Sequence, residues 1–207
     1  MNHTAKRNFD HLSAQLTTAW WYWKVYCQLF FDNQDRRQLI RNTVEPIFLQ
    51  YHHSVLLHVT LILARFGDRS ETFGQANLSF KNLIDQLDVS ESEIIQNQED
   101  FAETLTSLTD IRNKVIAHSD LRRILDVHSF LPSKLSVEKA LVSAGQFMNS
   151  IEKNFMNSTT AYEAIVLPLT GDGRALLILL QKALAYDKLE ELGKVNRGYW
   201  RDFGSEN

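Results

Sequence analysis

Long stretches of this chain place apolar residues at alternating spacings of three and four, which is the spacing of one face of an α-helix. The first stretch runs from Phe9 to Phe30, the second from Val44 to Phe66, and another from Val137 to Phe155. An alternation of apolar and polar residues, which would predict half-buried strands, never lasts more than a few residues. The chain is therefore expected to be all-α.

Residues that start or stop helices divide this pattern. Thr43 is a candidate cap for the second helix, with Pro46 in its first turn and Gly67-Asp68 at its end. Residues 67–77, rich in Gly, Ser, Asp and Asn, are expected to form a loop. Later candidate caps are Ser79, Ser90 with Glu93, Ser136 and Asp172, and Gly193 ends the last helix. We expect one antiparallel bundle of five to six helices over residues 1–193, followed by a C-terminal tail over residues 194–207.

The composition favours one soluble domain that is not drawn to nucleic acid by its overall charge. The chain has 207 residues, 44% of them hydrophobic, and a net charge of -3, so RNA contact would need a local basic patch. The start, Met1 to Asp10, is polar, which predicts no signal peptide. The most apolar stretch, Val55 to Phe66, is shorter than the roughly 18 apolar residues that span a membrane. We therefore expect a cytoplasmic protein without membrane contact.

One segment, Asp110 to Asp120, carries an unusual group of polar residues: Asp-Ile-Arg-Asn-Lys-Val-Ile-Ala-His-Ser-Asp. Arg112 and His118 are six residues apart, which places them about 120° apart around an α-helix and about 9 Å apart along its axis. One helix cannot easily direct both side chains at one phosphate. Two copies of the helix, packed about a two-fold axis, could bring both residues to a shared groove. The spacing therefore favours a composite site at a homodimer interface.

This segment resembles the signature of the HEPN superfamily (higher eukaryotes and prokaryotes nucleotide-binding), in which a histidine follows an arginine and a polar residue. The form Arg-Asn-Lys-x-x-Ala-His-x-Asp, from Arg112 to Asp120, is most similar to the abortive-infection, AbiU-type branch. The order of helices is also similar, including a second helix that ends in Arg-Phe-Gly-Asp. The resemblance implies an HEPN-like fold and a homodimeric RNA endonuclease of the toxin type that uses neither a metal nor another cofactor.

RNA cleavage without a metal requires a group that moves protons near neutral pH and a fixed positive charge on the phosphoryl oxygens. Histidine supplies the first function and the planar guanidinium of arginine supplies the second. His118 is thus the candidate general acid or base, Arg112 the clamp on the transition state, and Asn113 a positioning group. The nucleophile would be the 2′-hydroxyl of the RNA, which predicts 2′,3′-cyclic phosphate ends and no action on DNA.

Four neighbouring residues extend the candidate RNA-binding site: Lys114, Asp120, Arg122 and Arg123. The cations could hold flanking phosphates and Asp120 could orient an imidazole, although a solvated helix end would explain the same charges. In HEPN proteins that are silenced by adenylylation, a tyrosine lies two positions after the motif histidine. Asp120 occupies that position here and argues against such control. A cognate antitoxin or an activating protein is still a candidate partner.

Simpler interpretations stand beside the nuclease hypothesis. Arg112 could pair with the helix dipole and His118 could cap a helix end. An HEPN module could also bind nucleotide, RNA or a protein partner without cutting RNA, or need a second protein to become active. These alternatives predict the same fold and differ only in activity.

Two further polar groups are better explained by structure than by chemistry. The histidines of the second segment, His52, His53 and His58, lack the i, i+4 spacing of a zinc-binding pair, so no metal site is expected. The remaining basic cluster consists of Arg36, Arg37 and Arg41. We expect it to be a solvated face, with the rim of an RNA site as the alternative.

Overall fold

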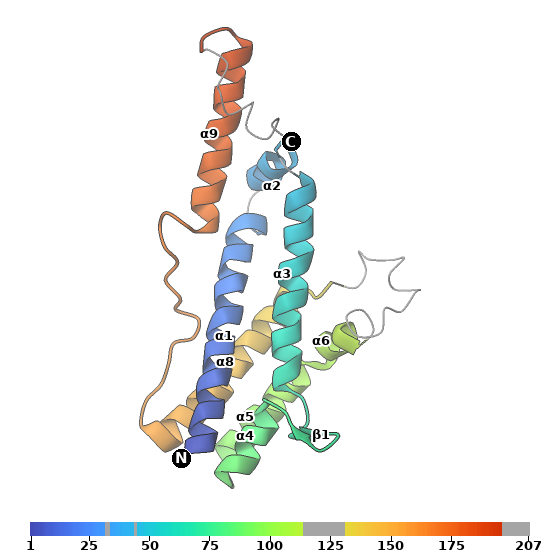
Figure 1. Ribbon diagram of the computed structural model, residues 1–207, viewed down its shortest axis with the longest axis vertical. Helices are drawn as coiled ribbons and strands as arrows, with labels where there is room; N and C mark the ends of the chain where they lie inside the picture. Colours follow the sequence, from blue (N-terminus) through green and yellow to red (C-terminus); the bar gives the residue numbers. More distant parts are fainter. Residues whose placement is uncertain (32–33, 44, 114–130, 196–207) are drawn as a thin grey trace. The chain divides into compact units, whose positions relative to one another are not determined.

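The computed structural model describes residues 1–31, 34–43, 45–113 and 131–195, and its regular elements are nearly all helices (Figure 1). The helices are α1 (His3–Phe30), α2 (Gln34–Arg41), α3 (Glu45–Phe66), α4 (Phe80–Leu87), α5 (Ser92–Thr104), α6 (Thr106–Ile111), α8 (Lys134–Met156) and α9 (Gly173–Glu191). Within these ranges the only sheet is a hairpin of two short strands, β1 (Glu71–Thr72) and β2 (Gln75–Ala76). The all-α fold class is confirmed.

The described residues form eight helices, against the five to six expected, because one helix was not predicted and one predicted helix is divided. The basic stretch after the first segment forms a helix of its own, α2. The predicted motif helix is interrupted at Leu105, which separates α5 from α6. The capping box at the start of α5 is wrong: the helix follows Glu91 without a side-chain cap, and the Ser90 amide donates to the Glu91 carboxylate instead.

The other helix starts depend on side-chain oxygens that accept hydrogen bonds from the first turn. Two predicted caps are confirmed: Ser79 accepts from the Asn82 amide at 3.3 Å, and Asp172 accepts from the Ala175 amide at 2.8 Å. Ser133 rather than Ser136 caps α8, because its hydroxyl accepts the Ser136 amide at 3.0 Å. The Thr43 cap stays a prediction. The hydroxyl of Thr43 donates to the carbonyl groups of Leu39 and Ile40 at the end of α2.

The described chain separates into two compact units. Unit 1 comprises Met1–Lys24 and Gln50–Val166, and unit 2 comprises Val25–Leu49 with the residues from Leu167 onward. The single domain expected over residues 1–193 stays a prediction. Apart from Lys194 and Val195, the expected tail lies outside the described residues.

Four phenylalanines form the centre of unit 1. The ring of Phe80 in α4 lies 5.0 Å from Phe66, 4.8 Å from Phe101 and 4.2 Å from Phe147, measured between ring centroids. All four rings are fully buried. Close aromatic packing of this kind stabilises a core beyond the area it buries. It also fixes the end of α3, where Phe66 lies, against α4, α5 and α8.

Unit 2 is held by the region around Asp172, which caps α9. Gln28 donates to the Asp172 carboxylate at 2.9 Å and accepts from the Gly173 amide at 2.8 Å. A Cβ at Gly173 would lie 3.0 Å from side-chain atoms of Gln28 and Leu29, so glycine permits this close approach. Asp172 therefore caps α9, as predicted.

By length and composition α3 is the one described helix that could cross a membrane. Core helices of soluble proteins meet the same criterion. In α3 the side chains of Val59, Leu63 and Phe66 are completely buried. This part of α3 therefore belongs to the core, while the cytoplasmic location stays a prediction.

Candidate nucleic-acid site

The site begins at Gly67, where the chain leaves α3 and passes close to the break between α5 and α6. A Cβ at this position would lie 2.2 Å from Cδ1 of Leu105, which is itself buried. Any larger residue must displace the Leu105 side chain. The close approach places the next residue, Asp68, beside the end of α6.

This packing leads to a stability prediction with an internal control. Gly67→Ala is expected to lower the free energy of unfolding by about 1–3 kcal/mol, because the added methyl overpacks Leu105. Gly145→Ala, in the middle of α8, is expected to raise it by about 0.5–1 kcal/mol. Its Cβ would meet Tyr162 at an ordinary 3.9 Å, and alanine favours a helix interior over glycine. Urea unfolding of both variants tests this, and equal midpoints would contradict the close approach.

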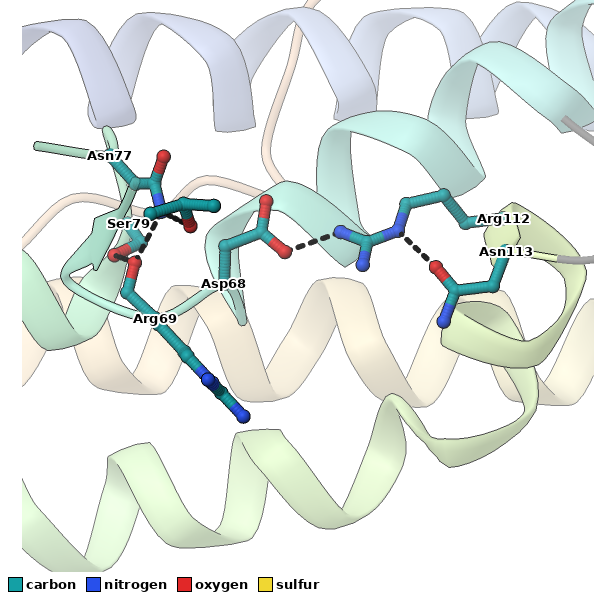
Figure 2. A network of polar contacts seen from close by, with 7 residues as sticks. Asp68, Arg69, Asn77, Ser79, Arg112 and Asn113 are labelled. Carbon is teal, nitrogen blue, oxygen red and sulfur yellow. Dashed lines mark hydrogen bonds and ion pairs between the residues drawn. The ribbon is translucent and has the colours of Figure 1, made fainter. Parts of the chain in front are cut away.

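Asp68 and Arg112 form an ion pair that joins the end of α3 to the end of α6 (Figure 2). A guanidinium Nη1 donates to the carboxylate, and the two side chains are 22% and 32% exposed, respectively for Arg112 and Asp68. Asn113 accepts a hydrogen bond from Nε of the same guanidinium at 3.1 Å. The motif arginine is therefore held from two sides by oxygen acceptors.

Arg112 directly follows α6 and keeps helical dihedral angles, with φ of -53° and ψ of -51°. The Arg112 amide bonds to the carbonyl groups of Leu108 and Thr109 and so closes α6. The preceding residue, Ile111, is the last of α6 and is buried.

The held guanidinium retains unused donors. An arginine side chain carries five N–H groups, and bonds to Asp68 and Asn113 use two of them. Among the described residues nothing accepts the others. A planar guanidinium with unused donors matches the geometry of a phosphoryl group.

A pocket of about 490 Å³ opens beside this ion pair. Its polar members come from the end of α3, from α6 and from the β1–β2 hairpin. It is lined by Ala64, Gly67, Asp68, Arg69, Glu71, Thr72, Phe73, Thr109 and Arg112. The pocket has the size of a small-ligand site, and the guanidinium group of Arg112 lies at its edge.

The hairpin beside the pocket is fixed by hydrogen bonds (Figure 2). The carbonyl group of Arg69 accepts from Asn77 Nδ2 at 2.8 Å and from the Ser79 hydroxyl at 3.3 Å. Asn77 Nδ2 also donates to the Thr72 hydroxyl at 2.8 Å. Residues 67–77, expected to be a loop, thus form a braced hairpin rather than an irregular connection.

A family model for AbiU2, an HEPN family, matches residues 4–176 of the chain. The chain belongs to the HEPN AbiU2 family. The match includes both members of the Asp68–Arg112 ion pair and confirms the AbiU-type resemblance. No curated protein and no solved structure gives a significant match.

In this AbiU2 protein the structure describes two of the seven predicted site residues, Arg112 and Asn113, and brings them into contact. The others lie outside the described residues: Lys114, His118, Asp120, Arg122 and Arg123. Sequence reasoning missed Asp68, which was interpreted only as part of a helix stop. Its position in the Arg-Phe-Gly-Asp sequence at the end of α3 was the available signal.

The histidines of α3 and the basic cluster of α2 were interpreted as structural, and members of both groups contact other residues of the AbiU2 protein. The His58 ring lies edge-on to Tyr22 at 5.0 Å, and burial, with the neighbouring charge of His53, lowers the pKa of His52. Within the described ranges, His, Cys, Asp and Glu side chains form no cluster of three or more that could hold a metal. In unit 2, Arg36 donates to the Gln28 carbonyl at 2.9 Å.

Asp68 is expected to act as a positioning residue for Arg112. For the RNA cleavage that the motif predicts, Asp68→Asn should lower the single-turnover rate about tenfold, since a charge-assisted bond is worth about 1.5 kcal/mol. RNA affinity should not fall, because the change removes a negative charge from the pocket. Glu71→Gln is the matched control: it removes a pocket charge without contact to Arg112 in the described structure. Equal rates for the two variants would contradict the positioning role.

Proposed function

We propose that this abortive-infection HEPN protein is a metal-independent RNA endonuclease that acts as a homodimer. The observation that supports the proposal best is the motif arginine, Arg112, which Asp68 and Asn113 hold at the edge of a polar pocket. A positive charge fixed before the reaction stabilises the charge that develops on phosphoryl oxygens without further reorganisation. Membership of the AbiU2 family supports the coarser assignment to an abortive-infection HEPN module.

The proposed reaction needs only the RNA, an imidazole and the guanidinium. The 2′-oxygen attacks the adjacent phosphorus, the bond from phosphorus to the 5′-oxygen breaks, and a 2′,3′-cyclic phosphate is left. The proton of the 2′-hydroxyl passes to the departing 5′-oxygen with the help of His118 as general acid–base. Arg112 would bind the non-bridging oxygens throughout, and Asn113 would hold its guanidinium in place.

A second candidate function is a non-catalytic module that binds RNA, nucleotide or a protein partner. One observation favours it: Arg112 already has a carboxylate partner in the single chain, so a structural role accounts for its position. Such a module would keep its affinity for RNA and would release no product.

Growth after expression distinguishes the two functions. The wild type should arrest its host, and Arg112→Ala or His118→Ala should restore growth at the same protein level. Arg65→Ala, which removes an exposed arginine of α3 outside the pocket, is the charge-matched control and should remain toxic. Equal growth of the wild type and both motif variants would favour the binding module.

A further inference from the structure

The tip of the β1–β2 hairpin holds an aromatic residue where the backbone disfavours one. Phe73 has φ of 53° and the next residue, Gly74, has φ of 77°, so both central positions of the turn are left-handed. Turns of this kind favour Asn, Asp or Gly at the first position, and a bulky residue there is an outlier. Strained positions of this sort persist mainly at functional sites.

The fold gains nothing from burying this ring, because Phe73 is fully exposed. Unlike the four phenylalanines of the core, it contributes nothing to packing within unit 1. It does line the same pocket as Arg112. A bulky apolar group in an unfavourable turn beside the motif arginine therefore indicates a ligand with a flat face.

The surroundings of Phe73 favour a nucleic acid over a protein. Its neighbours in the hairpin are exposed and mostly polar or charged, with Glu71 and Thr72 on one side and Gln75 on the other. A protein-docking surface has a larger continuous apolar centre than a single ring supplies. Stacking of one base needs only the ring.

Arg69 adds a second cation to the same pocket. Its backbone is fixed by Asn77 and Ser79, while its exposed side chain extends away from those bonds (Figure 2). In the described part of the chain no carboxylate pairs with it. The pocket also holds two acidic residues, of which Asp68 is paired with Arg112 and Glu71 lies on β1. An aromatic face with a free guanidinium nearby is typical of single-strand recognition.

We propose that Phe73 stacks on an unpaired base of the RNA substrate and that Arg69 binds the adjoining phosphate. This inference rests on the proposed nuclease function and narrows its substrate to single-stranded or looped RNA. Bases in a duplex are already stacked on each other, so their faces are not available to a protein ring. The braced hairpin would hold the nucleotide next to the phosphate that Arg112 binds.

Binding of a labelled single-stranded RNA of 12 nucleotides tests the proposal. The full chain is used with His118→Ala, so that the RNA is not cut during the measurement. Phe73→Leu keeps an apolar side chain but removes the π face, and should raise Kd about 5- to 150-fold. Phe73→Trp keeps a π face and should bind as tightly as the parent. Both changes are at a fully exposed position, so folding is not at risk.

Salt and duplex controls complete the experiment. Arg69→Ala should weaken RNA binding and make the fall of log K with log salt less steep, by the amount that corresponds to about one phosphate contact. Arg65→Ala should leave the affinity and the slope unchanged. A fully paired duplex should bind weakly and show no response to Phe73→Leu.

The possible results separate this proposal from the nuclease function. Equal RNA affinity for Phe73→Leu and the parent, or no RNA affinity at all, would overturn the stacking proposal. A change in oligomeric state with both Phe73 variants would overturn it in favour of protein docking. Binding that depends on Phe73 in a wild-type protein that cuts no RNA would support the stacking site and contradict the nuclease.

Discussion

Arg112→Ala is expected to slow RNA cleavage about 10²- to 10³-fold, the usual loss when one preorganised donor to a developing negative charge is removed. The loss should appear in the single-turnover rate more than in RNA affinity, because the guanidinium matters most as charge builds on the phosphoryl oxygens. Arg112→Lys should recover only part of the rate. Lysine restores the charge but cannot bind Asp68, Asn113 and phosphate at once through a planar fork.

Stability measurements show whether the lower cleavage rate of Arg112→Ala reflects the reaction itself or a less stable fold. The Asp68–Arg112 pair is partly exposed, so its removal should cost about 1 kcal/mol or less in free energy of unfolding. A thermal unfolding midpoint close to that of the wild type, together with the rate loss, would support a role in the reaction. A lysine variant as active as the wild type would contradict the role of the fork.

His118→Ala should reduce cleavage about 10²- to 10⁴-fold, the range for loss of general acid–base catalysis. Cleavage is measured with the same RNA and the same single-turnover protocol as for Arg112. The residue is expected to work with an Arg112 from a second copy of the chain, because the six-residue spacing predicts different faces for the two side chains on an α-helix. This pairing can be tested with mixed dimers.

A heterodimer of Arg112→Ala and His118→Ala protomers would contain one intact Arg–His pair contributed by opposite chains. Purified through two different tags, it should recover cleavage to about half the wild-type rate, because one of two symmetric sites is complete. Each homodimer of a single variant serves as the inactive control. An inactive heterodimer beside an active wild type would contradict a composite site made from opposite chains.

The sequence predicted a helix well where the informative residues lie within that helix or directly at its ends. The apolar periodicity from Val44 to Phe66, with Pro46 in the first turn and Gly67 at the end, predicted α3 almost to the residue. Caps were less certain: Ser133 precedes α8 and Ser136 lies in its first turn, and only the backbone geometry decides between them. The two-residue strands of the hairpin are too short to show any alternation.

The site was only half predictable for a related reason. Arg112 and Asn113 are adjacent, so a motif reveals both. Asp68 is 44 residues from Arg112 in the sequence and meets it only because Gly67 lets the chain pass close to Leu105. Phe73 lies in a segment whose composition indicates a loop. Its proposed role depends on exposure and on a left-handed backbone, and neither is visible in a sequence.

The most direct measurement incubates the purified wild-type protein with an end-labelled RNA in excess EDTA and identifies the product ends. We expect cleavage to proceed, to leave 2′,3′-cyclic phosphates, and to stop when a 2′-deoxy nucleotide replaces the one at the cut. Failure to cut the RNA, a requirement for a divalent metal, or cleavage that persists at the 2′-deoxy position would contradict the central claim that Arg112 and His118 assist attack by the RNA's own hydroxyl.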